Sequence, residues 1–517
     1  MIAYTMDVAH VIAKLLIEGK ITSRAELQQK KIEMARRYKA RRLPSNAEIL
    51  TFVPEDQKRK MLDILKLKPT RTLSGVAPIA VMTSPAECPH GRCLYCPGGV
   101  ERGTAQSYTG REPAALRAEA HKFDPYEQVK SRIEQLDAIG HCTDKIDLII
   151  MGGTFTARDR TYQKWFVQRC FDAMNSMPSK SIEEAHKMNE NAAHRCIGLT
   201  VETRPDWFRE EHVQNALFLG ATRVELGVQT LFDDVLEKVE RGHKVQDTIE
   251  ATKEAKNAGL KVCYHIMPGL PGSTPERDIE VFRRLFECEE FRPDMLKIYP
   301  TVVVEGTKLY EMWRQGEYEP YDLDTVVRIV AEAKHIIPPY VRVQRIQRDI
   351  PAPLIDAGVK KGNLRQIVRG YMKEHGMKCR CIRCREVARV KGKIGHVEMR
   401  YHEYRASGGR EMFLSLEAED GDAIIGYARL RSAEASQYAY VREVKVFGEV
   451  VPIGDKGGRR WQHRGFGRQL MSECEELARE WGYEGVRVTS GVGVREYYRA
   501  LGYSLEGPYM VKNIKNT

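Results

Sequence analysis

The sequence has no apolar run close to the roughly 18 residues that a membrane-spanning helix requires, and no internal repeat or low-complexity tract is evident. Asp7, His10 and Lys14 interrupt the apolar pattern of residues 1–16, which predicts an amphipathic helix and not a signal peptide. These absences exclude an integral membrane protein and a repeat array. We therefore expect a cytoplasmic chain without a membrane partner.

Acidic residues are scarce between residues 30 and 71, although the whole chain has 71 of them against 82 lysines and arginines. Such a patch suits a nucleic-acid backbone, because each neutralised phosphate releases counterions. The alternative is an ordinary solvated helix face, and the charges alone do not separate RNA from DNA. The basic residues of the segment are Lys30, Lys31, Arg36, Arg37, Lys39, Arg41, Arg42, Lys58, Arg59, Lys60, Lys66, Lys68 and Arg71.

Six strand-like apolar runs alternate with longer amphipathic stretches of helical spacing. This alternation predicts βα units around a parallel sheet, which forms a partial or complete barrel. Sites in such folds lie at the carboxyl ends of the strands, where Gly152, Gly153, Glu202 and Gln229 fall. The six runs are residues 76–83, 146–151, 197–203, 223–228, 261–267 and 294–299.

A turn-rich basic stretch follows at residues 338–395, and residues 396–517 change to strand, strand, long strand, glycine turn, helix, strand, helix. About 120 residues suffice for one small α+β domain. The 517 residues of the whole chain exceed one ordinary core, and a hydrophobic content of 42% is normal for a globular protein. We therefore expect an α/β fold with a barrel at residues 76–337, a linker, the α+β domain, and a basic helical region at residues 1–75.

Half of the twelve cysteines form two triplets, and in a reducing compartment such clusters indicate metal more often than disulfides. Cys88, Cys93 and Cys96, with gaps of four and two residues, follow the first strand. Three thiolates without a nearby fourth ligand favour a 4Fe–4S cluster with one open iron, whereas structural zinc, the alternative, takes four ligands. The other cysteines, expected in the core, are Cys142, Cys170, Cys196, Cys263, Cys288 and Cys474.

The first triplet and the glycine pair after the second strand resemble the radical S-adenosylmethionine (radical SAM) superfamily, although most members have three residues in the first gap. The resemblance implies that the open iron binds S-adenosylmethionine and that reduction cleaves this cofactor to a 5′-deoxyadenosyl radical. By position, Gly152 and Gly153 lie close to the methionine moiety, because glycine allows a close backbone approach. Glu202 and Gln229 are candidate polar contacts to the same cofactor, or ordinary strand-end residues.

A second glycine motif, Gln-x-x-Gly-x-Gly at residues 462–467, lies between a long strand and a helix, where backbone N–H groups bind anions. With the aromatic segment downstream, it is similar to the GNAT acetyltransferase superfamily, which binds the diphosphate of coenzyme A on this loop and pairs the pantetheine arm with the preceding strand. Tyr497 and Tyr498 match a segment that keeps a tyrosine near the thioester, or are core aromatics. The other acetyl-CoA contacts implied are Glu443, Val444, Lys445, Val446, Gln462, Arg464, Gly465, Phe466, Gly467 and Arg468.

The chain closely resembles the catalytic subunits of Elongator complexes over nearly its whole length. The resemblance rests on the order of the two halves, on the SGVG-R-x-YY segment at residues 490–498 and on the QRDIP segment at residues 347–351. The resemblance implies an acyltransferase that forms 5-carboxymethyluridine at the wobble position of tRNA. The deoxyadenosyl radical takes a hydrogen from the acetyl methyl group, the acetyl radical adds to carbon 5 of uridine, and the thioester is hydrolysed. Lys145, which matches a family position implicated in acetyl-CoA contact, and Lys297 are candidate catalytic lysines.

Because the acetyl group must reach the barrel, we expect the two sites to face one cleft. A wobble base is stacked in the anticodon loop and must be splayed out to enter a pocket. The basic N-terminal region is expected to hold the tRNA backbone of the anticodon stem-loop. Other Elongator-type subunits or a second copy of the chain are further candidate partners.

The second triplet, Cys379, Cys381 and Cys384, lies in the expected linker. Its tight spacing favours a structural tetrahedral zinc ion, with His375 as a candidate fourth ligand. A second iron–sulfur cluster and unmetallated cysteines are the alternatives.

Two other functions stay open from the sequence. The chain could be a protein lysine acetyltransferase with a structural iron–sulfur domain, or a nucleic-acid-binding scaffold without turnover. The intact first triplet and the basic N-terminus favour tRNA modification over the first alternative, and two intact cofactor motifs argue against the second.

Overall fold

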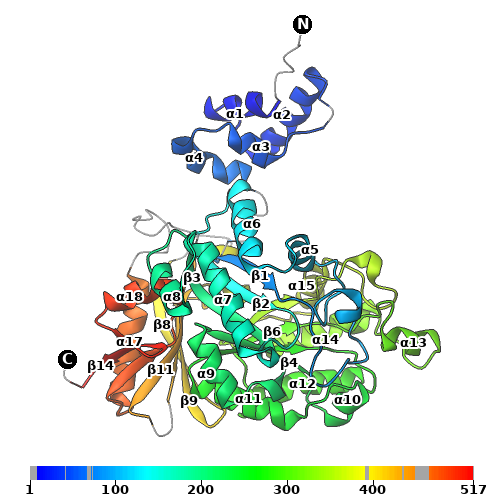
Figure 1. Cartoon of the computed structure of the whole chain (residues 1–517), viewed down its shortest axis with the longest axis vertical. Coiled ribbons are helices and arrows are strands. Elements are labelled where there is room, and N and C mark those ends of the chain that lie inside the picture. The colour runs from blue at the N-terminus through cyan, green and yellow to red at the C-terminus, as the bar shows by residue number, and fades with distance from the viewer. Residues whose placement is uncertain are drawn as a thin grey trace.

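Two seven-stranded sheets organise the chain, one parallel throughout and one mainly antiparallel. The computed structural model describes residues 8–40, 42–66, 72, 74–390, 395–432, 436–448 and 465–515. In Figure 1 the two sheets and their helices form the main body, and a small helical group at the N-terminal end stands apart from it. No helix in these ranges is both long enough and apolar enough to cross a membrane.

The N-terminal group consists of four helices that pack around apolar side chains such as Ile12 and Ile49. Ser23 begins the second helix by accepting a hydrogen bond from the backbone N–H of Glu26 (3.2 Å), which satisfies one of the free N–H groups at the helix start. The group meets the main body beside α6 (Pro125–Ala138). Its helices are α1 (Val8–Ile17), α2 (Arg24–Arg37), α3 (Asn46–Thr51) and α4 (Glu55–Leu65).

The parallel sheet holds its strands in sequence order, and every neighbouring pair is parallel. Right-handed crossovers in this order place the connecting helices on one face of the sheet. The strands are β1 (Ala77–Met82), β2 (Lys145–Met151), β3 (Arg195–Thr203), β4 (Arg223–Gln229), β5 (Lys261–Ile266), β6 (Met295–Ile298) and β7 (Arg342–Ile346). Besides α6, the helices are α5 (Pro113–Ala120), α7 (Arg160–Asn175), α8 (Ile182–Asn189), α9 (Glu210–Phe218), α10 (Asp233–Lys238), α11 (Val245–Asn257), α12 (Pro275–Glu287), α13 (Lys308–Arg314), α14 (Leu323–Ile336), α15 (Leu364–Glu374) and α16 (Ile382–Arg385).

An ion pair between distant strands shows that this sheet is strongly curved. The ammonium nitrogen of Lys297 on β6 lies 3.3 Å from a carboxylate oxygen of Glu202 on β3. With β4 and β5 between them, these strands would run about 14 Å apart in a flat sheet. Contact over that separation places both side chains on the inner face of a partial barrel, and this confirms the predicted architecture.

The seventh strand was not among the six predicted runs. β7 lies inside the stretch expected to be a turn-rich linker, and it pairs with β6 at the open edge of the barrel. Its five residues, Arg-Val-Gln-Arg-Ile, include two arginines and follow Pro338 and Pro339, so the segment has no apolar run. The strand is formed by its neighbour, because β6 offers an edge of unpaired N–H and C=O groups.

The C-terminal sheet has the order β13-β14-β12-β11-β10-β9-β8, and only β11 and β12 are parallel. Four strands precede the long helix where three were predicted, and two short strands close the chain. The elements are β8 (Val397–Ala406), β9 (Gly409–Ala418), β10 (Ile424–Arg431), β11 (Tyr438–Val446), α17 (Phe466–Glu480), β12 (Gly485–Val488), α18 (Arg495–Arg499), β13 (Ser504–Glu506) and β14 (Tyr509–Asn513).

A fully buried ionic cluster joins the barrel to the C-terminal sheet. Arg442 of β11 donates two hydrogen bonds to Asp294 in the barrel (2.7 and 2.8 Å) and a third to Glu411 of β9 (2.8 Å). Arg429 and Lys256 lie within the same cluster and are also fully buried. Removing one partner from such a cluster leaves an uncompensated buried charge, which strongly favours a single relative placement of the two domains.

Two glycines allow the backbones of the two domains to approach closely. A Cβ atom on Gly491 would lie 2.2 Å from the carbonyl oxygen of Ile197 in β3, and one on Gly493 would lie 2.5 Å from the Cβ of Arg195. Both glycines belong to the SGVG-R-x-YY segment that the sequence singled out. The motif is therefore explained in part by domain packing, because no larger residue fits there.

Candidate functional site

The first cysteine triplet lies buried on the loop after β1, and each sulfur has its own polar neighbour. The backbone N–H of Ser107 donates to the sulfur of Cys96 (3.2 Å), and the guanidinium of Arg241 donates to the sulfur of Cys93 (3.6 Å). Hydrogen bonds to thiolate sulfurs and a buried cation stabilise negative charge on an iron–sulfur cluster. The donor set of this loop therefore fits such a cluster.

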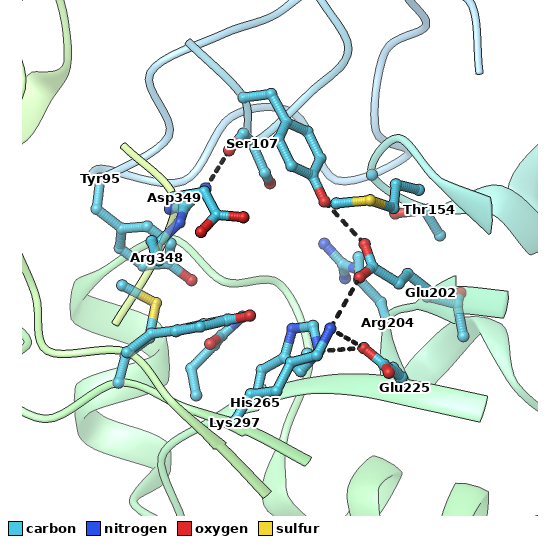
Figure 2. A pocket seen from close by; sticks show the side chains of 18 of the residues that line it. Tyr95, Ser107, Thr154, Glu202, Arg204, Glu225, His265, Lys297, Arg348 and Asp349 are labelled. Atoms are coloured by element: carbon cyan, nitrogen blue, oxygen red, sulfur yellow. Dashed lines mark hydrogen bonds and ion pairs between the residues drawn. The ribbon is translucent and has the colours of Figure 1, made fainter. Parts of the chain in front are cut away.

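A cavity opens beside the triplet at the carboxyl ends of the barrel strands, and we call it the radical cavity (Figure 2). Cys88, Gly153, Glu202 and Gln229 line it, as the sequence predicted for a site at these strand ends. Gly152 is not part of its lining; a Cβ there would lie 2.1 Å from the hydroxyl of Thr83. The glycine pair thus combines one cavity-lining residue with one that permits close packing.

The strand-end position of Gln229 has an unusual backbone. Its φ is +72°, in the left-handed region that non-glycine residues rarely occupy. Such strain persists only where the surrounding structure enforces it, and it concentrates at functional sites. This supports a specific role for Gln229 over that of an ordinary strand-end residue.

A chain of hydrogen bonds and ion pairs crosses the interior of the barrel from the radical cavity (Figure 2). The hydroxyl of Tyr108 donates to Glu202 (2.9 Å), and the Lys297 ammonium bridges Glu202 and Glu225. His265 forms a hydrogen bond to Glu225 (2.9 Å). Lys297 therefore lies where the sequence predicted a catalytic lysine, held by two carboxylates, and sequence reasoning missed both Glu225 and His265.

Opposite charges set the ionisation of the buried pair Glu225 and Lys297. Burial alone would raise the pKa of Glu225, but the Lys297 ammonium and His265 hold the pKa well below its usual range. Burial would lower the pKa of Lys297, but Glu225 holds it well above its usual value. Both groups are therefore charged at neutral pH.

Cys263 lies close to Glu225 and His265, but the Lys297 ammonium already neutralises the Glu225 carboxylate, so a divalent cation is not favoured there.

A second cavity, of about 480 Å³, lies between the two domains, and we call it the acyl cavity. Its lining includes Lys145 and each described residue that the sequence assigned to acetyl-CoA, namely Glu443, Val444, Lys445, Val446, Gly465, Phe466, Gly467, Arg468, Tyr497 and Tyr498. Gln462 and Arg464 lie outside the described residues. The barrel adds residues that sequence reasoning missed: Asp147, Ile197, Gly198, Thr222, Arg223 and Lys261.

The expectation that both sites face one cleft is wrong for this arrangement. Lys145 begins β2 and lines the acyl cavity, whereas Met151 ends β2 and lines the radical cavity. The two cavities therefore lie at opposite ends of the barrel strands, separated along β2 by about 20 Å at 3.3 Å per residue. Lys145 is consequently not at the carboxyl-end mouth of the barrel. Burial lowers the pKa of its ammonium.

Only one ion pair separates the linings of the two cavities on β4. Arg223 lines the acyl cavity, and Glu225, two residues later on the same face, lines the radical cavity. Their side chains lie 3.5 Å apart (Nε to Oε1), and Arg223 also contacts Asp147 at 3.3 Å. Side chains two residues apart on a strand share a face, so this pair lies inside the barrel between the two sites.

The glycine turn of the acyl cavity leads directly into α17. Gly465 has a φ of +85°, so it turns the chain into the helix in a conformation that glycine adopts freely. A Cβ on Gly467 would lie 2.8 Å from the hydroxyl oxygen of Tyr497. Tyr497 is partly exposed in the cavity, whereas Tyr498 is buried against Tyr503, so Tyr498 also belongs to the aromatic core.

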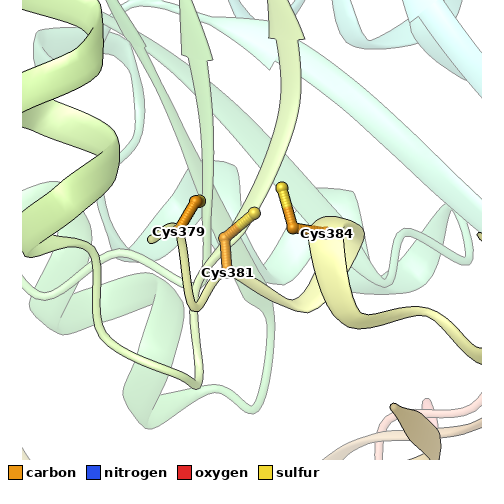
Figure 3. A group of neighbouring side chains, drawn as sticks. All are labelled: Cys379, Cys381 and Cys384. Carbon is orange, nitrogen blue, oxygen red and sulfur yellow. The ribbon is translucent and has the colours of Figure 1, made fainter. Parts of the chain in front are cut away.

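The sulfurs of the second triplet, Cys379, Cys381 and Cys384, lie within 4.8 Å of one another (Figure 3). Such spacing fits one tetrahedral ion. The first triplet is not gathered in this way, and a four-iron cube holds its thiolates farther apart than a single ion does. His375 is not part of the group in the described residues; its ring stacks on Tyr371.

The basic N-terminal region is only partly a free cationic surface. Lys31 is buried and its ammonium donates to the side chain of Asn46, and burial lowers its pKa. Lys30 pairs with Glu33 at 2.7 Å. Arg41, Lys68 and Arg71 lie outside the described residues.

Family models match this chain over most of its length. Residues 84–285 match the radical SAM superfamily, and residues 293–374 match the radical SAM C-terminal domain. Residues 386–503 match the GNAT acetyltransferase family, and residues 5–73 match the ELP3 N-terminal domain.

Relatives span the whole chain. A tRNA uridine(34) acetyltransferase of Methanocaldococcus jannaschii is 50% identical, over 98% of this chain and 97% of its own length. The human Elongator complex protein 3 is 42% identical, over 99% of this chain and 97% of its own length. The chain belongs to the Elongator protein 3 family. A solved structure of the Methanocaldococcus infernus Elp3, lacking its N-terminus, matches with a TM-score of 0.76 and 46% identity, over 86% of this chain and all of that one.

Membership in the Elongator protein 3 family makes the barrel a radical SAM half-barrel and the C-terminal sheet a GNAT domain, in an enzyme of the tRNA uridine(34) acetyltransferase type. A radical SAM domain implies a 4Fe–4S cluster and S-adenosylmethionine, and the hydrogen bonds to the sulfurs of Cys93 and Cys96 fit such a cluster. Acetyl-CoA fits the GNAT domain, whose strand β11 and glycine turn border the acyl cavity.

Proposed function

We propose that this chain converts the wobble uridine of tRNA to 5-carboxymethyluridine, using acetyl-CoA and S-adenosylmethionine. The observation that carries the proposal is the placement of the two cavities, one at each end of the same barrel, with the linings in contact at Arg223 and Glu225. Relatives over nearly the whole chain are named tRNA uridine(34) acetyltransferases, which supports a reaction at uridine 34 of tRNA. We propose domains at residues 1–75, 76–337, 338–395 and 396–517, with β7 of the third segment completing the barrel sheet of the second.

At the radical cavity, Cys88, Cys93 and Cys96 would hold the 4Fe–4S cluster. When bound, the cluster and S-adenosylmethionine supply a 5′-deoxyadenosyl radical that takes a hydrogen atom from the acetyl methyl group. Gly153 would leave room for the methionine moiety, Gly152 would support it by allowing close packing against Thr83, and Glu202 and Gln229 would offer polar contacts.

Among the described residues, Lys297 supplies the one lysine ammonium in the lining of the radical cavity. Glu202 and Glu225 fix its position from two sides. The Lys297 side chain therefore loses its rotamer freedom when the protein folds, so this entropy cost does not recur at each turnover. A cation there favours negative charge on a carbonyl oxygen or on the uracil ring. We propose this as the catalytic role of Lys297.

At the acyl cavity, the residues Glu443 to Val446 of β11 would pair with the pantetheine arm. The N–H groups at the start of α17, near Gly465 to Arg468, would bind the diphosphate. Tyr497 and Lys145 flank the cavity where the acyl end would lie, with Tyr498 behind them. Gln462 and Arg464 belong to the same proposed loop.

The acetyl group must pass from one end of the barrel to the other for the reaction to occur. Arg223 and Glu225 mark the place where the distance between the two cavities is shortest along β4. The Arg223 guanidinium contacts both Asp147 and Glu225, so it keeps one carboxylate partner when it moves away from the other. We propose that this pair lies on the acyl path and is displaced when the acyl group enters.

Substrate tRNA would be held by the basic N-terminal region, with its wobble base splayed into the radical cavity. The second cysteine triplet would bind zinc and fix the segment between the domains. We further propose that the protein acts in the cytoplasm, either with Elongator-type partner subunits or as a homodimer.

The test uses anaerobically reconstituted protein with tRNA, methyl-deuterated acetyl-CoA and S-adenosylmethionine. We expect deuterium in the released 5′-deoxyadenosine and 5-carboxymethyluridine in digested tRNA. Omission of tRNA should reduce turnover sharply. Equal acetylation of a histone-like peptide, without an effect of tRNA or S-adenosylmethionine, would contradict the proposal and favour a protein lysine acetyltransferase.

A further inference from the structure

A third cavity, of about 650 Å³, adjoins the radical cavity, and we call it the basic cavity. Arg345, Arg348 and Asp349 line both cavities, so the two are continuous. The walls come from the end of β7, from the QRDIP segment, and from the segments that carry α15 and α16. Six of its lining residues are cations, namely Arg111, Arg345, Arg348, Lys360, Arg365 and Arg383.

Asp349 is the one carboxylate in this lining, and it already pairs with Arg345 (2.5 Å). Among the described residues, no ion pair involves Arg111, Lys360 or Arg383. Arg365 donates only to backbone carbonyl groups of the β7 edge, at 3.3 and 3.4 Å. A cavity with five cations beyond its single ion pair has strong mutual repulsion, which an anion would relieve.

The backbone of the QRDIP segment is strained at the cavity wall. Gln347 has a φ of +135°, a conformation that non-glycine residues rarely adopt. The strain holds Arg348 toward the radical cavity, where its guanidinium donates to the carbonyl oxygen of Ser107. Backbone strain of this kind is retained where a segment has a functional geometry. The sequence singled out this segment without giving it a role.

We propose that the basic cavity binds a phosphodiester group of the RNA strand next to the nucleotide in the radical cavity. The inference rests on the proposed function, because it requires a nucleotide in the radical cavity. Guanidinium groups match phosphate oxygens in pairs, and a splayed base in a single-stranded loop leaves its neighbouring phosphates accessible. Continuity of the two cavities places such a phosphate beside the reacting nucleotide.

The second cysteine triplet gains a role from this placement. Arg383 lies between Cys381 and Cys384, and it lines the basic cavity. Figure 3 shows the three cysteines gathered around the start of α16 (Ile382–Arg385), the short helix that carries Arg383, so an ion held by the sulfurs would fix this helix in place. Arg383 is thus a binding residue whose position depends on the cysteine loop.

The experiment measures binding of a fluorescent anticodon stem-loop RNA to the full-length protein, as a function of salt. Lys360→Gln and Arg383→Gln are the test variants, and Arg380→Gln is the control, because Arg380 is an exposed arginine of the same segment outside the cavity lining. We expect each test variant to weaken binding by about fivefold to tenfold more than the control, and to reduce the slope of log affinity against log salt by about one.

Equal affinity and equal salt slope for Lys360→Gln, Arg383→Gln and Arg380→Gln would overturn the proposal. Lys360 is exposed, so its variant tests the cavity even where Arg383→Gln folds poorly, and thermal unfolding checks both. Titration with inorganic phosphate tests whether the cavity binds free phosphate instead. If Arg383→Gln loses phosphate binding but keeps its RNA affinity, the cavity binds free phosphate and the proposal of an RNA phosphodiester is rejected. RNA binding does not require turnover, so failure here is distinguishable from failure of the proposed reaction.

Discussion

The cavity at the carboxyl ends of the barrel strands and the cavity at their amino ends are built in different ways. The radical cavity is lined by the barrel strands and by the segment that follows β7, and charged side chains such as Glu202, Lys297 and Glu225 determine its interior. The acyl cavity lies between two domains, and its lining includes β11 and the turn before α17, where a Cβ on Gly467 would lie 2.8 Å from the Tyr497 hydroxyl oxygen. A substitution that removes a charge should therefore impair the radical cavity most, whereas one that adds a methyl group should impair ligand binding in the acyl cavity most.

The difference follows from what each end has to bind. A cluster and a sulfonium cofactor carry charge in a low-dielectric site, where a fixed set of opposing side chains controls the energy. A long, flexible coenzyme is held along its length by backbone N–H and C=O groups and at its phosphates by a helix N-terminus. Substitutions that affect one cavity and leave the other unchanged would support this difference between the radical cavity and the acyl cavity.

The largest effect is expected from Cys93→Ser at the radical end. Loss of one of three thiolates should remove the visible absorption of the reconstituted cluster and reduce 5′-deoxyadenosine formation to background, because serine is a poor ligand for iron. Coenzyme A binding, measured by calorimetry, should stay unchanged. Cys170→Ser is the matched control, since Cys170 is equally buried but lies in α7, outside either triplet. A cluster that survives Cys93→Ser would refute the assignment of the triplet.

A smaller but still large effect is expected from Lys297→Met. Removal of the ammonium leaves Glu202 and Glu225 facing each other in the barrel, which should lower the free energy of unfolding by about 3–5 kcal/mol. Lys445→Met in the acyl cavity should cost about 1 kcal/mol or less. Chemical denaturation measures both, and the double variant Lys297→Met/Glu225→Gln should recover part of the loss. Equal costs for the two lysines would remove the proposed contrast between the ends.

A moderate effect is expected from Gly467→Ala at the acyl end. The new methyl group would lie 2.8 Å from the Tyr497 hydroxyl oxygen, at the start of α17. We expect coenzyme A affinity to fall about tenfold, or about 1.4 kcal/mol, with normal cluster absorption. Adding Tyr497→Phe removes the contacted oxygen and should restore part of the affinity. Gly370→Ala, in open space on α15, is the control and should change neither property. Undiminished affinity in Gly467→Ala would argue against the proposed coenzyme position.

The cavity residues that the sequence predicted share a local signal. Cys88, Gly153 and Glu202 follow strand-like runs, and the glycines of the acyl cavity form a motif, so each could be found from neighbours in the chain. Glu225 and Arg223 gave no such signal, because in sequence they are ordinary charged residues within a strand. Their importance arises from curvature of the sheet, which brings β3 and β6 within reach of one another.

The relative placement of the sites was also beyond the sequence. Lys145 lines the same cavity as the residues that the sequence assigned to acetyl-CoA, but its position at the start of β2 puts it about 20 Å along the strand from the radical cavity. The expected single cleft failed because it assumed that both domains meet at the carboxyl ends of the strands. Packing of Gly491 and Gly493 against β3, and the Arg442–Asp294 pair, instead bring the C-terminal domain to the amino ends.

The smallest effect is expected from Lys256→Met, at the buried junction between the two ends. Burial lowers the pKa of Lys256 to about 8, from about 10.5 in the unfolded chain, so the unfolded state binds more protons between these values. The contribution of this lysine to stability should therefore be present above pH 10.5, decrease as the pH falls, and be lost below about pH 8. Glu411 keeps Arg431 and Arg442 as partners when Lys256 is removed, so its charge stays compensated. Methionine fills similar volume without charge, so the variant should lack this pH dependence and change stability by about 1 kcal/mol at pH 7. Denaturation midpoints of the wild-type protein and of Lys256→Met, measured from pH 7 to 10, test this pH dependence. If stability changes with pH equally in the two proteins, Lys256 is not buried as described. Cluster absorption and coenzyme A affinity should both stay normal, because Lys256 lines neither cavity.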